Sequence, residues 1–284
     1  MCRVRLALTL LRGVVSVSIL VVLLARISLD EVMARASAGA FAPLAAALAL
    51  VLLMYLLVSL RWRTLAGALG LALSVRFALR AVFLGVFGGQ LLPASVGSDL
   101  VRGWAAARHS GSVPRAAASV VADRLVALFG ACLLLALAHA ALGGIALPFA
   151  GLLAPAAVLA SGGLLLGFLL ACRVPLQPVP VAAAALAALA IHAIGVLAAA
   201  LTAAAYGVDA SLAVWFSIIP VSLIATAVPI SINGWGVREA VIVALAAGHG
   251  IAAADALVVS ITLGVLNVVA SLPGAYLLVF HDGR

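Results

Sequence analysis

Long apolar runs, separated by short loops that carry isolated arginines, dominate this sequence. A helix that crosses a bilayer needs about 20 apolar residues, and runs of this length recur from one end of the chain to the other. The alternating strands of about ten residues that build a membrane β-barrel are absent. The pattern predicts an all-α, polytopic membrane bundle, with full spans at about residues 6–25, 41–60, 119–142, 149–171, 181–206 and 255–280.

Two further apolar segments, at about residues 77–97 and 212–232, are interrupted by a proline and then by small residues. In each, an arginine follows nine positions after the proline. A helix broken inside lipid must find partners for its free backbone groups in protein or in a water-lined cavity, and paired breaks in two halves of a chain are typical of a transporter binding site. The two pairs are Pro93 with Arg102 and Pro229 with Arg238.

The positions of the arginines predict how these segments cross the membrane. Basic residues favour the cytoplasmic side, so Arg3 and Arg5 place the N-terminus there. The arginines that follow residues 77–97 stay on that side only if this segment dips into the membrane and returns. When the membrane crossings are counted in this way, the segment at residues 212–232 enters from the opposite face and the C-terminus lies in the cytoplasm. Residues 98–118 are then expected to form a short amphipathic helix that is closed by Gly111 and Pro114.

The predicted architecture is one domain over residues 1–284, with six full spans and two re-entrant broken helices in an inverted repeat. Its halves lie at about residues 41–142 and 181–280, and eight full spans are the alternative. With 67% hydrophobic residues, 8% charged residues and a mean hydropathy of +1.38, the composition excludes a soluble domain. The net charge of +8 comes from arginines that stand singly between apolar segments, which indicates loop sidedness and anionic lipid rather than nucleic acid.

Each break carries residues suited to binding an anion. After Gly97, either Ser98 or Asp99 can cap a helix whose first turns contain Arg102. A helix N-terminus offers free N–H groups and a positive dipole end, and arginine grips phosphate with two hydrogen bonds. The second break repeats the design with Asn233 as cap, Gly234 and Gly236 for close backbone approach, and Arg238 beside Glu239.

A structural interpretation of the same residues competes with this one. The prolines would only kink helices, Asp99 would pair with Arg102, and Glu239 would pair with an arginine. Asp123 and Arg124 lie near the start of a span, where ionisable groups need partners or a role. Asp123 is expected to pair with Arg102 or Arg115, or to accept a coupling proton. Four tryptophans fit interfacial anchoring, and the last of them also fits contact with a substrate: Trp62, Trp104, Trp215 and Trp235.

No cofactor or metal site is expected, since the five histidines share no ligand spacing and no catalytic motif is present. The two breaks resemble the family of lysylphosphatidylglycerol synthase transmembrane-region proteins, also called flippase-like. Its first signature maps onto Pro93, Gly97-Ser98-Asp99, Arg102 and Asp123-Arg124, with Ser98 where a second glycine is usual. Its second maps onto Pro229, Asn233-Gly234 and Gly236 to Glu239.

The resemblance implies the flippase-like half alone, without the aminoacyl-transferase domain of full-length synthases. The function expected is translocation of an anionic phospholipid or lipid-linked headgroup across the cell (inner) membrane. One alternative is a non-catalytic membrane subunit that supports a lipid- or glycolipid-synthesis enzyme, and another is an integral-membrane lipid transferase. The lipid, the energy source and the oligomeric state are left open.

Overall fold

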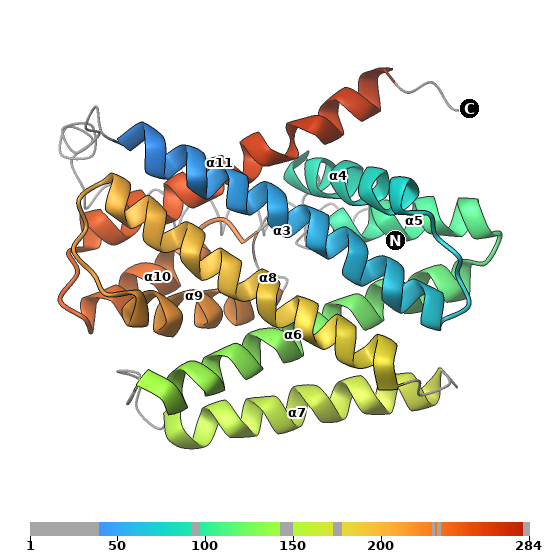
Figure 1. The fold of residues 1–284 in the computed structure, drawn as a ribbon, viewed down its shortest axis with the longest axis horizontal. Helices are drawn as coiled ribbons and strands as arrows, with labels where there is room; N and C mark the ends of the chain where they lie inside the picture. The colour runs from blue at the N-terminus through green and yellow to red at the C-terminus, as the bar shows by residue number, and fades with distance from the viewer. Residues whose placement is uncertain are drawn as a thin grey trace, which may run out of the picture.

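A computed structural model describes residues 40–91, 97–142, 150–172, 178–228, 231 and 234–280. The described chain is all helical, which confirms the predicted fold class of a polytopic membrane protein (Figure 1). Its helices are α3 (Phe41–Ala68), α4 (Val75–Leu91), α5 (Gly97–Ser110), α6 (Val113–Leu142), α7 (Ala150–Ala171), α8 (Pro178–Ala205), α9 (Leu212–Ala227), α10 (Val237–Ala247) and α11 (Ala253–Phe280).

Five of the described helices are long and apolar enough to cross a membrane, and they correspond to five of the six predicted full spans. The sixth, at residues 6–25, lies outside the described residues. Helix α3 runs on past the predicted end of its span to Ala68, because Arg61 and Trp62 are buried inside the bundle and do not mark its surface. The crossing regions are Phe41–Ala68, Val113–Ala141, Leu153–Ala171, Pro180–Ala205 and Ala253–Leu278.

The two interrupted segments form pairs of short helices. Helix α4 packs against α5, and α9 packs against α10, so each pair folds back on itself as a hairpin. These helices have 17, 14, 16 and 11 residues, each below the length of about 20 that a full span requires. In the described part of the chain, neither segment therefore forms the continuous helix that eight full spans would need.

The hairpins lie at opposite ends of the bundle, with α4 and α5 at one end and α9 and α10 at the other (Figure 1). Helices α3 and α8 cross between them and pack along each other. The order long, short, short, long is the same in α3 to α6 and in α8 to α11. The packing between the two sets is also reciprocal, since α4 packs on α11 and α9 packs on α6.

Glycines with positive φ close equivalent helices in the two sets. Gly70 follows α3 with a φ of 75° and Gly207 follows α8 with a φ of 67°. Gly111 and Gly250, with φ of 69° and 74°, follow the second short helix of each hairpin. Left-handed glycines of this kind end helices because other residues rarely adopt the conformation. The predicted amphipathic helix therefore ends at Gly111, whereas Pro114 lies in the first turn of α6 and residues 113–118 belong to that helix.

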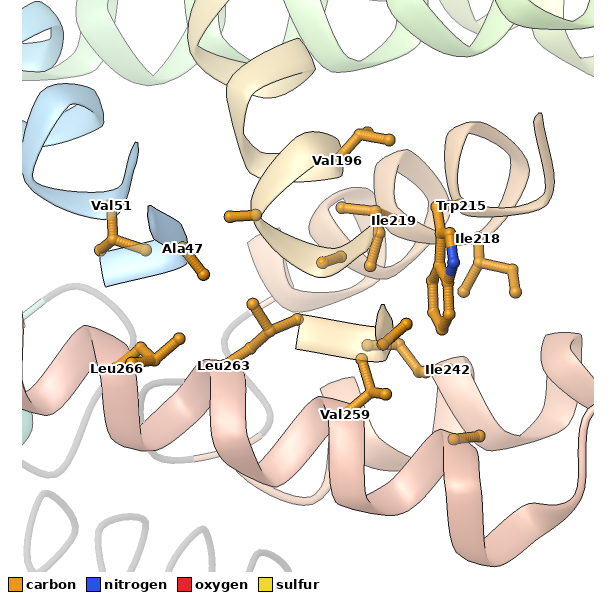
Figure 2. Close-up of a cluster of buried hydrophobic side chains, with 14 of the residues drawn as sticks. Ala47, Val51, Val196, Trp215, Ile218, Ile219, Ile242, Val259, Leu263 and Leu266 are labelled. Carbon is orange, nitrogen blue, oxygen red and sulfur yellow. The ribbon is translucent and has the colours of Figure 1, made fainter. Parts of the chain in front are cut away.

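The main apolar core joins the two sets of helices. In Figure 2, Val51 of α3, Val196 of α8 and Ile242 of α10 converge with side chains of α9 and α11. Trp215 belongs to this core and is fully buried, and Trp62 is fully buried in a second cluster around α4 and α5. The prediction that these two tryptophans anchor the protein at the membrane surface is therefore wrong, whereas Trp104 is largely exposed.

Small residues let α4 and α5 approach closely. A Cβ atom built on Gly85 would lie 2.8 Å from the backbone oxygen of Ser98, and one on Gly89 would lie 3.2 Å from the Ser98 nitrogen. Glycines four residues apart are the usual means by which helix backbones meet in membranes. This contact fixes the start of α5 against α4.

We expect Gly85→Ala to lower the free energy of unfolding by about 1–3 kcal/mol, because the added methyl group must push α4 away from the α5 backbone. Equilibrium unfolding of the purified protein in detergent measures the change. Gly163→Ala is the matched control, since a Cβ on this α7 glycine meets nothing within 4 Å. Equal stability of the two variants would contradict the close approach.

Candidate functional site

A cavity of about 300 Å³ lies between the two sets of helices. Its wall is mostly apolar, and both hairpins and the helices α3 and α8 contribute residues to it. The polar and aromatic lining residues are Tyr55, Gln90, Ser98, Arg124, Ser222, Thr226, Trp235, Arg238 and Asn267. A volume of this size is at the lower end of the range of roughly 300–1,000 Å³ that small-molecule sites occupy.

Arg238, in the first turn of α10, presents one guanidinium group to the cavity. Its Nε and Nη2 donate to Oε1 of Glu239 at 3.0 and 2.6 Å, and its Cζ lies 4.9 Å from the centre of the Trp235 ring. Its side chain is 17% exposed. The cation is thus held by a carboxylate on one side and an aromatic face on the other, in a fixed position on the wall.

Glu239 is the fully buried group that organises this end of α10. Its Oε2 accepts a hydrogen bond from the backbone N–H of Gly236 at 2.6 Å, and its Oε1 accepts one from Ser260 at 3.2 Å. A carboxylate at a helix N-terminus is stabilised by the free N–H groups and the helix dipole. Gly236 and Gly234 have φ of 85° and 80°, which explains the glycines at these positions.

Arg102 has a different environment from its counterpart Arg238. It is buried, and its Nη2 and Nη1 donate to Oδ1 of Asp99 at 2.5 Å and to Oδ2 of Asp123 at 3.0 Å. Its Cζ lies 5.2 Å from the Trp62 ring centre. Arg102 is not among the residues that line the cavity.

Arg124 is the arginine through which the first half reaches the cavity. Its Nε donates to Oδ2 of Asp99, and 47% of its side chain is exposed. At the other end of the same network, Arg61 donates from Nε to Oδ1 of Asp123 at 2.8 Å. Cations and carboxylates therefore alternate from α3 through α6 and α5 to the cavity wall, in the order Arg61, Asp123, Arg102, Asp99, Arg124.

Only some of the predicted site residues line the cavity. Ser98, Arg124 and Arg238 line one cavity. The ion pairs expected for Asp99 with Arg102 and for Glu239 with an arginine are confirmed, and Asp123 pairs with Arg102 as expected and also with Arg61. Gly97, Gly234 and Gly236 are buried turn or helix-start positions. Pro93, Pro229 and Asn233 lie outside the described residues.

Sequence reasoning missed the polar residues of the long helices. Tyr55 of α3 donates a hydrogen bond from its hydroxyl to Oδ1 of Asn267 of α11 at 2.9 Å, and both line the cavity. The available signal was a polar residue inside a predicted span, which usually faces the bundle interior. Among the described residues, no group of three His, Cys, Asp or Glu side chains is placed to hold a metal ion.

The sequence model of one protein family, the lysylphosphatidylglycerol synthase TM region, matches residues 9–178. This chain belongs to that family. The match covers more than half of the chain and includes the α4–α5 hairpin and the ionic network of the first half. No curated protein and no solved structure matches the chain. Family membership supports a membrane function connected with lipids.

Proposed function

We propose that this protein is a lipid translocase, which moves an anionic phospholipid or lipid-linked headgroup across the cell membrane. The observation that carries the proposal is that Arg124 and Arg238, from opposite halves of the chain, line the same cavity inside a membrane bundle. Guanidinium groups bind phosphate with paired, charge-assisted hydrogen bonds. The headgroup would occupy the cavity while its acyl chains stay in the surrounding lipid.

The cost of placing charges in the membrane supports a functional role for these arginines. Ionisable residues within spans are rare and expensive, and those that persist usually mark a substrate pathway or a pairing network. Here Asp99, Asp123 and Glu239 are buried and hold arginines in place, while Arg124 and Arg238 also reach the cavity. In this proposal the carboxylates position the cations, and Ser98 and the glycine-containing turns bring backbone groups close to the headgroup.

The two sets of helices fit the proposal as inverted halves, at about residues 41–142 and 181–280. With both termini in the cytoplasm, the α4–α5 hairpin would enter from the cytoplasmic side and the α9–α10 hairpin from the other. Related hairpins at opposite ends of one site are the usual means by which a transporter opens it to each side in turn. Such movement would use facilitated diffusion or an ion gradient.

The test is lipid movement in proteoliposomes. We expect Arg238→Ala to slow translocation of a fluorescent anionic phospholipid roughly 10- to 100-fold, because a charge-assisted hydrogen bond contributes about 1.5–3 kcal/mol. Accessibility of the fluorophore to an external quencher reports the rate. Arg76→Ala is the matched control, since Arg76 is exposed at the start of α4 and does not line the cavity. Equal rates in wild type and Arg238→Ala would refute the assigned role of Arg238.

The same vesicles separate the alternatives. A lipid transferase would convert the labelled lipid into a new species, which thin-layer chromatography detects, whereas a translocase leaves it chemically unchanged. A supporting subunit of a lipid- or glycolipid-synthesis enzyme would show no movement of lipid when reconstituted alone. We expect relocated, unmodified lipid.

A further inference from the structure

An apolar groove between α6 and α9 lies beside the cavity: we infer that it binds an acyl chain of the lipid whose headgroup occupies the cavity. The inference rests on the proposed translocase function and adds a binding site for the hydrocarbon part of the lipid. It follows from the chemistry of the groove, from its position along α9, and from the closed packing of the equivalent interface between α4 and α11.

The groove has a volume of about 310 Å³ and is lined by leucine, alanine and phenylalanine alone. Its α6 side runs from Leu134 to Ala141, near the end of a helix that is long and apolar enough to cross the membrane. Its α9 side consists of Leu212, Ala213 and Phe216, and Leu212 is 44% exposed. A groove that has no hydrogen-bonding side chain and is open to the membrane fits an acyl chain.

The groove and the cavity follow one another along one face of α9. Phe216 lines the groove, and Ile219, one turn further along, lines the cavity. Residues three and four positions apart lie on the same face of a helix, and this face continues from Ile219 to Leu223 and Thr226 of the cavity wall. The same side of α9 is therefore purely apolar in its first turns and reaches the cavity with the two arginines in its later turns.

The length of this face matches the length of a lipid. Leu212 of the groove and Thr226 of the cavity are 14 residues apart on α9. Helix of this length extends over about 21 Å. One leaflet of a bilayer, from the headgroups to the ends of the chains, is about 20–22 Å thick. A lipid whose headgroup is held in the cavity can therefore place a chain in the groove at the same time.

The equivalent interface between α4 and α11 is closed. A Cβ atom built on Gly274 of α11 would overlap with the carbonyl oxygen of Phe83 of α4 and would lie 2.8 Å from Cβ of Phe87. Phe83 also packs edge-on against Tyr55 of the cavity wall, with the ring centres 5.9 Å apart. Of these two equivalent interfaces, the one between α6 and α9 is therefore the one with room for a chain.

The groove by itself would not select a lipid, because the surrounding acyl chains are as apolar as leucine side chains. Selection comes from the headgroup. Once the arginines hold the headgroup, the chain attached to it is present beside the groove at a high effective concentration. Occupation of the groove should therefore depend on Arg238, whereas an ordinary lipid of the surrounding membrane would show no such dependence.

The test uses phosphatidylglycerol that carries a photoreactive diazirine in one acyl chain, in vesicles that contain the protein. After illumination, mass spectrometry of the peptides locates the labelled residues. We expect the groove segments of α6 and α9 to be labelled roughly 10-fold more than Leu159 and Leu186, because a charge-assisted hydrogen bond to the headgroup increases binding by a factor of roughly 10–100. These two leucines are exposed on α7 and α8 and lie outside the groove. Arg238→Ala should reduce groove labelling to their level, and Arg76→Ala should not.

Two substitutions fill the groove from its two sides. Ala213→Phe on α9 and Ala141→Phe on α6 should each slow lipid movement in the flipping assay about tenfold, as expected where a packed space is overfilled. Ala141 is exposed, so the ring added there does not disturb the core. Ala140→Phe is the matched control, because Ala140 is the exposed neighbour of Ala141 and does not line the groove. It should keep the wild-type rate.

The possible results separate the groove from the translocase. Uniform labelling of the exposed leucines and the groove, together with normal lipid movement, would overturn the inference and leave the proposed function standing. Groove labelling that persists in Arg238→Ala would also overturn it, since the chain would then belong to a lipid of the surrounding membrane. A disulfide-linked dimer that forms with Ala213→Cys and not with wild type would show that a second copy of the chain covers the groove. Failure of wild type to move lipid would refute the translocase, and the inference with it.

Discussion

Replacing Asp123 by asparagine should lower the free energy of unfolding by about 3–5 kcal/mol, the largest stability loss that we expect from one substitution. The Asp123 carboxylate is 2% exposed and accepts hydrogen bonds from both Arg61 and Arg102. Removing one partner of a buried ion pair leaves the other charge uncompensated. Around a membrane bundle, little water is available to solvate that charge. Equilibrium unfolding in detergent measures the change.

Two further variants make the Asp123 result specific. Asp209→Asn is the same chemical change on an exposed loop residue and should be close to neutral. Replacing Arg61 and Asp123 together by leucine should recover part of the loss, because a buried pair is often exchanged for apolar residues at little cost. Similar stabilities for the two asparagine variants would show that the ionic network does not hold α3, α5 and α6 together.

Filling the cavity at Gly264 should stop transport. A Cβ on this α11 glycine would overlap with Nη2 of Arg238 and lie 2.5 Å from the Trp235 ring. We expect Gly264→Leu to displace both side chains and to lower the translocation rate more than 100-fold. The effect should exceed the roughly 10- to 100-fold loss expected for Arg238→Ala, because the position of the cation and the volume of the cavity are lost together. The flipping assay in proteoliposomes measures the rate.

Gly163→Leu is the control for the Gly264 variant. It adds the same side chain to a helix in the membrane, at a position that is exposed and meets nothing within 4 Å. Wild-type transport is expected there. Gly264→Ala should fall between the two, because it adds only one methyl group against the Arg238 and Trp235 side chains. Full transport by Gly264→Leu would mean that the lipid path does not pass Arg238.

The parts of the fold that depend on local sequence patterns could be predicted from the sequence. The length of the apolar runs determines the crossing helices. Proline disfavours the helical conformation in the residue before it, and α4 and α9 end at Leu91 and Ala227, each two residues before the prolines of the breaks. The hairpins follow from these breaks, and the arginine positions led to the same prediction for the first of them.

The cavity wall was less accessible, because it depends on which way side chains turn after helices pack. Matching spacing made Arg102 and Arg238 appear equivalent, yet Asp123 of α6 draws Arg102 into the protein, and Arg124 reaches the cavity instead. The bond between Arg61 and Asp123 joins residues 62 positions apart, and no local pattern marks it. The contact between Tyr55 and Asn267 joins two helices that are far apart in the sequence, so no local pattern predicts it.

The position of Arg61 has a consequence for how the protein is made. Its counter-charge Asp123 belongs to α6 and leaves the ribosome 62 residues later. Until then α3 carries an arginine without its partner, at a cost of up to about 3 kcal/mol for a charge at the centre of an isolated membrane helix. We therefore expect Arg61 to become fully buried only after α6 has been inserted, so that the last helix of the first half completes its packing.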